Sequence, residues 1–193
     1  MKDLFICIFA VLVFCCTNNN KIPKTSEPQN IISNIKFNSS ELQFDSIANA
    51  FYSQTRNPKW NANANTFPFF YKGYGFDNVR GIFSKENTLI GLVLRSYFQN
   101  KNVYPSDNLT ILEKEYGKPI KVHQDPTPND VKAKGEYPNK LWYKNGVSVL
   151  LTYSIDTNGY DIIMHTYIFN HLYFGLNKSN SIDEVLATIK KYM

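Results

Sequence analysis

The stretch LWYKNGVSVLLTY, residues 141–153, predicts the fold more directly than any other part of the chain. Two runs of aromatic and aliphatic residues flank Asn145-Gly146, and an Asn-Gly pair tolerates the positive φ angles that a two-residue hairpin turn requires. A second turn at 157–159 leads into a further run at 160–169, rich in isoleucine and aromatic residues. We therefore expect three consecutive antiparallel strands.

A short amphipathic helix is expected before these strands. Residues 105–108, PSDN, are typical of a helix start, and Leu109, Leu112 and Tyr116 recur on one helical face. Gly117, with a proline two positions later, marks the end of that helix. A brief strand should follow, and the polar, proline-rich stretch 124–138 is predicted to be a loop.

The first half of the chain repeats this order of helix and strands. A helix is indicated by a capping box, Ser40 with Gln43, and by the apolar spacing of Phe44, Ile47, Ala48 and Phe51. A hairpin is then predicted from 79–83 and 88–98, with its turn at 85–87.

The chain closes with another expected helix, which Ser181 and Glu184 cap and whose apolar side should dock on the sheet. The predicted fold class is α+β, with short helices packed on an antiparallel sheet in a single domain over 35–193. Its halves, 35–104 and 105–193, are either a tandem duplication of a helix-plus-meander unit or one mixed domain of the same order.

Composition indicates a globular protein and gives little reason to expect a nucleic-acid partner. Hydrophobic residues make up 43% of the chain, which is enough to build a buried core. The net charge is +5. However, the basic residues are spread along the chain among acidic ones, so no run of like charge forms an arm or patch.

The amino terminus is expected to be a cleaved leader. Residues 4–14 are apolar without a break, too short for a membrane-spanning helix but of the right length for a signal-peptide core. The three cysteines, Cys7, Cys15 and Cys16, all lie in this region, so the domain itself has no disulfide or thiol metal site.

Residues 13–16, Val-Phe-Cys-Cys, resemble the bacterial lipobox, with an aliphatic residue three places before the cysteine and a small residue directly before it. The resemblance implies cleavage after residue 15, lipid attachment at Cys16 and a place in the cell envelope, with the outer membrane favoured. An ordinary cleaved signal peptide and an uncleaved anchor are the alternatives. Residues 16–34, poor in aromatics, are expected to be a flexible tether.

The second half also resembles a family. A helix, then Tyr116-Gly-Lys-Pro119, then a meander with Trp142-Tyr143 just before its turn are similar to the small outer-membrane lipoproteins that accompany the β-barrel assembly machine. The same layout is found in the tandem repeats of β-lactamase inhibitor protein. Both likenesses imply binding of other proteins rather than catalysis.

No catalytic constellation, metal site or cofactor motif stands out in the sequence. His165 lies in an apolar strand, where a structural imidazole is the simpler interpretation, and no metal-binding pair of histidines is present. The Gly-x-Ser-x-Gly signature of a nucleophile elbow is also missing. Asp156 and Asp161, which could in principle bind calcium, are better explained as parts of a turn.

One segment, residues 60–76, is typical of a binding loop because it combines seven aromatic residues with glycine and asparagine. The candidate partner-binding residues are Trp60, Phe70, Tyr71, Tyr74 and Phe76. The alternative is that most of these rings fill the core under a long loop.

The main functional hypothesis is therefore a non-catalytic envelope lipoprotein. It would bind a protein or cell-wall glycan partner through the sheet face or the aromatic segment. Two alternatives stay open: a hydrolase outside the cytoplasm with a site assembled from dispersed residues, and a carrier of a small apolar ligand.

Overall fold

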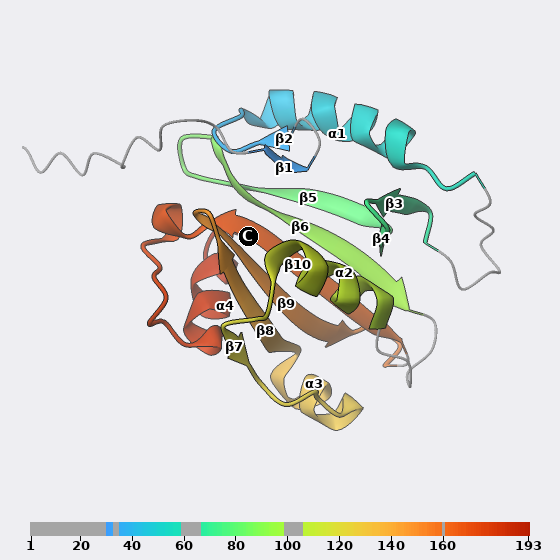
Figure 1. Ribbon diagram of the computed structural model, residues 1–193, viewed down its shortest axis with the longest axis vertical. Helices are drawn as coiled ribbons and strands as arrows, with labels where there is room; N and C mark the ends of the chain where they lie inside the picture. Colours follow the sequence, from blue (N-terminus) through green and yellow to red (C-terminus); the bar gives the residue numbers. More distant parts are fainter. Residues whose placement is uncertain (1–29, 33–34, 59–66, 99–105, 160) are drawn as a thin grey trace, which may run out of the picture.

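The computed structural model describes residues 30–32, 35–58, 67–98, 106–159 and 161–193. An antiparallel sheet of six strands forms the centre of this part of the chain (Figure 1). In spatial order its strands are β5 (Asn78–Phe83), β6 (Leu89–Phe98), β10 (Ile162–Asn170), β9 (Val147–Ile155), β8 (Glu136–Lys144) and β7 (Lys121–Val122).

Each face of the sheet is covered by a different set of elements. The first face packs against α1 (Glu41–Thr55), α2 (Ser106–Tyr116), α3 (Pro128–Lys134), the strand β2 (Ile35–Lys36), and the hairpin β3 (Phe69–Tyr71) and β4 (Tyr74–Phe76). The short strand β1 (Asn30–Ile32) pairs with β2. The second face packs against α4 (Ile182–Lys190) and the short 3₁₀ turn η1 (His171–Phe174). Each face therefore has its own apolar cluster.

The predicted α+β class is confirmed, together with the local signals behind it. Asn145 and Gly146 have φ of 51° and 78°, as a tight turn between β8 and β9 requires. Capping boxes open α1 at Ser40 and α4 at Ser181. Among the described residues, no helix has the length and apolar character needed to cross a membrane.

The prediction of a loop over 124–138 is wrong. Seven residues of this stretch form α3, and β8 already begins at Glu136. Thr127 caps the helix by accepting from the backbone N–H of Asp130, and Pro128 stands at the first helical position, where a missing N–H costs nothing. A sequence that looked like a proline-rich loop is in fact a helix start, and Gly135 ends it at φ 73°.

Asn30–Ile32, at the end of the expected tether, pair with Ile35–Lys36 as a small antiparallel sheet. The predicted bounds of the tether and of the domain stay predictions. The predicted leader over 1–15 and the rest of the tether lie outside the described residues, so both stay predictions.

The two halves meet at the middle of the sheet. The last strand of the first half, β6, pairs with the last strand of the second, β10, and the strand that precedes each lies next outward. Both α1 and α2 lie on the same face. A tandem duplication would give this order of strands. The second half, however, contributes two more strands to the sheet than the first. The duplication therefore stays a prediction.

Candidate functional site

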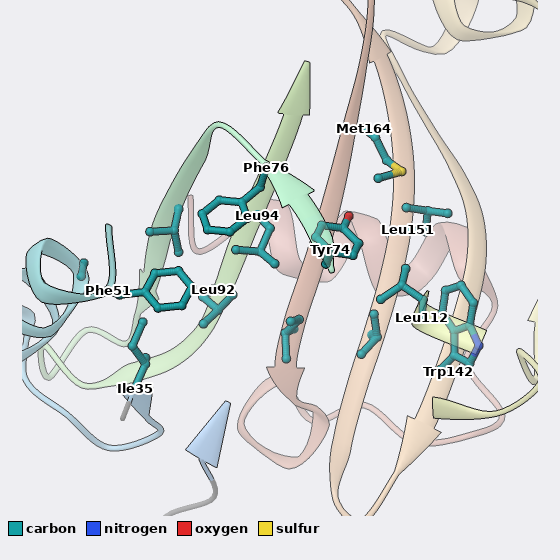
Figure 2. Close-up of a cluster of buried hydrophobic side chains, with 14 of the residues drawn as sticks. Ile35, Phe51, Tyr74, Phe76, Leu92, Leu94, Leu112, Trp142, Leu151 and Met164 are labelled. Carbon is teal, nitrogen blue, oxygen red and sulfur yellow. The ribbon is translucent and has the colours of Figure 1, made fainter. Parts of the chain in front are cut away.

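The aromatic segment divides into buried and exposed rings. Tyr74 and Phe76, on β4, are 4% and 0% exposed, and Figure 2 shows both within the core, with Phe76 near Phe51 and Leu94. Phe76 stacks on Phe51 with ring centroids 5.5 Å apart. Buried rings cannot contact a partner protein at the surface, so Tyr74 and Phe76 are not retained as candidate partner-binding residues.

A buried asparagine explains why β4 is held against the sheet. The side chain of Asn108 on α2 accepts from the N–H of Gly75 at 2.9 Å and donates to the carbonyl of Gly75 at 2.8 Å. Ser96 on β6 donates to the same carbonyl at 2.6 Å. The strands of this hairpin have three residues each, and they do not pair the outward N–H and carbonyl of Gly75. The bonds from Asn108 and Ser96 satisfy these two backbone groups.

The other candidate residues of the segment are differently placed. Phe70 is 38% exposed, and Tyr71 is half-buried with its ring 5.6 Å from that of Phe51. Phe70 is thus the candidate ring in the hairpin that a partner could reach directly. Trp60 and the lipid-attachment candidate Cys16 lie outside the described residues.

The second face of the sheet has a regular pattern of side chains, because strand pairing sets opposite residues side by side on one face. One row, Val93, Tyr167, Leu150 and Leu141, is apolar at most positions and belongs to the cluster around α4. The next row contains Arg95, His165 and Thr152, and the row after that Tyr97, Ile163, Ser154 and Glu136. The face therefore changes from apolar to polar along its strands.

Helix α4 packs against β8 and β9, so the polar residues on β6 and β10 lie beside it. Arg80 on β5 stands opposite Val93, at the end of the apolar row and diagonal to Arg95. We call these side chains the polar strip, which consists of Arg80, Arg95, Tyr97, Ser154 and His165. Both arginines are exposed and the other three residues are half-buried. The strip joins two pairs of consecutive strands, β5 with β6 and β9 with β10, that are far apart in the sequence, and no local pattern in the sequence indicates it.

Arg95 is held in place by an acidic neighbour. Its Nε donates to Asp77 Oδ1 at 2.7 Å, and the other carboxylate oxygen accepts from the N–H of Tyr97 at 3.1 Å. Burial raises the pKa of Asp77, against the lowering effect of Arg95. The Tyr97 hydroxyl donates to Asp161 at 2.7 Å, and this bond, with a smaller effect of burial, raises the pKa of Tyr97 to about 12.

On the other side of the strip, Glu136 is surrounded by donors. Tyr167 donates to it at 2.7 Å, Thr152 donates to the same oxygen, and Lys190 of α4 forms an ion pair with the second oxygen. Burial acts to raise the pKa of this carboxyl, but His165 and these donors outweigh it and hold the pKa below its usual value. The end of α4 is thus fastened to the polar rows.

At the centre of the strip, His165 Nε2 lies 2.8 Å from Ser154 Oγ, and the two side chains form a hydrogen bond. Burial lowers the pKa of His165, and the nearby charges of Lys190, Arg95 and Arg80 lower it further, against the opposing effect of Glu136. The imidazole is therefore neutral at pH 7. The sequence predicts a structural imidazole at His165 within an apolar strand. The structure places this imidazole among polar and charged side chains.

Comparison with family models, curated proteins and solved structures finds no match. What the chain can do is therefore inferred from its own geometry. Within the part of the chain that the structure describes, no three His, Cys, Asp or Glu side chains group as metal ligands. Asp156 and Asp161 are joined by a turn, with the Asp156 carboxylate accepting from the N–H of Asp161 at 2.9 Å.

The lowered pKa of His165 predicts that acid destabilises the fold. As pH falls through about 6.5, the unfolded chain takes up a proton at this position before the folded chain does, so the free energy of unfolding decreases. Well above pH 6.5 the imidazole is neutral in both the folded and the unfolded chain, so its titration does not change the free energy of unfolding. The loss of stability grows as pH falls, until the imidazole of the folded chain also takes up a proton. In urea unfolding followed by circular dichroism, His165→Gln should lose less stability than the wild type between pH 7.5 and 5.5.

Two variants make this measurement specific. Ser154→Ala removes the hydrogen bond but keeps the imidazole together with the burial and neighbouring charges that lower its pKa, so its pH dependence should stay close to that of the wild type. Burial also lowers the pKa of His171, which adds a loss of the same sign that both variants retain. An unchanged pH dependence in His165→Gln would show that this imidazole does not titrate differently in the folded chain.

Proposed function

We propose that this chain is a cell-envelope lipoprotein, anchored through lipid on Cys16, whose α+β domain binds a partner protein without catalysis. The observation that supports binding is the polar strip, where Arg80, Arg95 and Tyr97 lie exposed or half-exposed on one sheet face. Arginine and tyrosine are enriched at the energetic centres of protein interfaces, because both combine a large apolar surface with directed hydrogen bonds. Phe70 is a second, smaller candidate contact.

Site-specific photo-crosslinking in the cell that makes the protein tests the binding surface. A benzoylphenylalanine in place of Tyr97 should give a covalent adduct with another protein. The matched control is the same residue in place of Leu42, which is 81% exposed on α1, in the layer on the opposite face. Adducts from position 42 but none from position 97 would rule out the polar strip as the binding surface.

The anchor has its own prediction. Labelling with an alkyne palmitate analogue should mark the wild-type protein. Cys16→Ser should abolish the label, because the remaining Cys15 would follow the bulky Phe14 where the lipobox has a small residue. Cys15→Ser is the matched control and should keep the label, since serine is also small. Loss of label in Cys15→Ser with retention in Cys16→Ser would move the anchor to Cys15, and labelling of neither variant nor wild type would contradict the lipoprotein proposal.

A hydrolase is the second candidate, because the structure brings Ser154 and His165 within hydrogen-bonding distance. A serine nucleophile needs such a base, and the base in turn needs an orienting group on its other ring nitrogen. Among the described residues, no carboxylate is hydrogen-bonded to His165 Nδ1. A fluorophosphonate probe that labels the wild type but not Ser154→Ala would favour this candidate over pure binding.

The carrier of a small apolar ligand is less well supported. It requires aromatic side chains around a cavity, whereas the rings of α1 and the β3–β4 hairpin pack on one another. Phe69 and Phe76 lie 5.6 Å apart, and Tyr52 and Phe69 lie 4.7 Å apart.

A further inference from the structure

Arg80 differs in its surroundings from the other cations near the polar strip. Arg95 is paired with Asp77, and Lys190 with Glu136. Arg80 is exposed on β5, and within the described part of the chain no carboxylate lies within 4.0 Å of its guanidinium as an ion-pair partner. One positive charge of the strip is therefore left without a partner.

Arg80 lies near the same side chain, His165, as Arg95 does. Arg80 and Arg95 both influence the pKa of His165, which stands directly opposite Arg95 in the sheet. Two of the three arginines of the whole chain thus lie near one imidazole, although lysine is much the commoner basic residue in this sequence. Arginine, unlike lysine, offers a planar fork of donors that fits the two oxygens of a carboxylate.

The charges and apolar side chains around Arg80 indicate which kind of anionic ligand the strip can bind. Asp77 pairs with Arg95, Glu136 pairs with Lys190, and Asp161 accepts a hydrogen bond from the Tyr97 hydroxyl, so Arg80 is the cation of the strip that is left to pair with a singly charged group. Ile163 is half-buried between Tyr97 and Ser154 in the outer row, so apolar surface adjoins the arginine side chains. This mixture is typical of a protein interface, whereas polymers of phosphate are bound by several unpaired cations.

We infer that the polar strip binds a carboxylate side chain on an acidic segment of a partner protein, with Arg80 as the residue that pairs with it. The inference rests on the proposed function and names the chemistry of the partner. Arg95, fixed by Asp77, presents its remaining guanidinium N–H groups beside the same position. Tyr97 and Ile163 contact the apolar neighbours of the carboxylate.

Fluorescence anisotropy with the full mature chain in a neutral detergent tests this inference. The probe is a fluorescein-labelled peptide of five repeats of Glu-Ala-Tyr, and the matched peptide carries Gln in place of Glu. The glutamate peptide should bind, more weakly as salt rises, and the glutamine peptide should bind roughly tenfold less well or worse. A labelled oligothymidylate, which carries phosphodiester charges and no carboxylate, should bind no better than the glutamine peptide.

Three arginine variants locate the contact. Arg80→Gln should weaken binding of the glutamate peptide by roughly tenfold or more, because an exposed glutamine keeps the strand but removes the charged fork. Arg80→Lys should fall between this variant and the wild type. Arg56→Gln, at the exposed end of α1, is the control and should bind as the wild type does.

Each contrary result has a distinct meaning. Equal binding of the glutamate peptide by Arg80→Gln and the wild type would overturn the role of Arg80. Equal binding of the two peptides, or tighter binding of the oligothymidylate, would overturn carboxylate recognition. Adducts from position 97 in cells would persist in all three cases if the proposed function holds, so failure of this inference is separable from failure of the proposed function.

Discussion

Trp142→Ala should destabilise the protein by about 3–5 kcal/mol, the range for removing a fully buried large aromatic side chain. Trp142 is 0% exposed and packs with Leu112 and Leu151 between α2 and the sheet (Figure 2). Its indole N–H also donates to the carbonyl of Gly117 at 2.9 Å, which ties the end of α2 to β8. Both the ring and this bond are lost in the alanine variant.

Chemical unfolding followed by far-UV circular dichroism measures the effect. Trp142→Phe keeps much of the apolar volume and loses the hydrogen bond, and should cost about 1–2 kcal/mol. Leu42→Ala removes an 81% exposed side chain and should stay within about 0.5 kcal/mol of the wild type. A loss of less than about 1 kcal/mol in Trp142→Ala would mean that the ring is not buried as described.

Asn108→Ala should destabilise the protein by about 2–3 kcal/mol, although it removes only a small polar side chain. Asn108 is 3% exposed, and its amide bonds to the N–H and the carbonyl of Gly75. The carbonyl keeps Ser96 as a donor, but the N–H is left buried without a partner. That orphaned donor, rather than lost packing, accounts for most of the expected cost.

Asn108→Asp separates this cause from simple loss of volume. At neutral pH its carboxylate can still accept from the Gly75 N–H but faces the Gly75 carbonyl without a proton to donate, so the folded state favours the protonated acid. Its pKa in the folded chain is then raised, and the variant should be closest to wild-type stability below about pH 4 and lose stability as pH rises through the folded pKa. Unfolding measured at pH 4 and pH 7 would contradict this if the variant were no worse at pH 7.

The local parts of this fold were predictable because their signals span only a few residues. Asn145-Gly146 fixes a turn by the φ values that two neighbours accept, and Ser181 with Glu184 caps a helix across four residues. The same rule applied to Thr127 and Asp130 would have found α3. Prolines at 126 and 128 favour a loop when the composition alone is considered, although proline is well suited to the first turn of a helix.

The candidate site could not be predicted in the same way. Its residues come from β5, β6, β9 and β10, and they meet only because Arg95 pairs with His165 and His165 with Thr152 across the sheet. A shift of one residue in either pairing would turn the other side of the strand to this face. Which aromatic rings of the hairpin are buried likewise depends on contacts with α1 and α2, not on their spacing.

The pairing of β6 with β10 at the middle of the sheet has a consequence for how the chain matures. Residues 91–98 find their partners at 162–169, so more than half of the second part must be made before this contact can form. Until then, a long strand with mostly apolar side chains on both faces has one bare edge, and such an edge is a template for wrong association between molecules. A nascent chain halted before β10 would therefore be prone to aggregate, and a holding chaperone would be most useful during that interval.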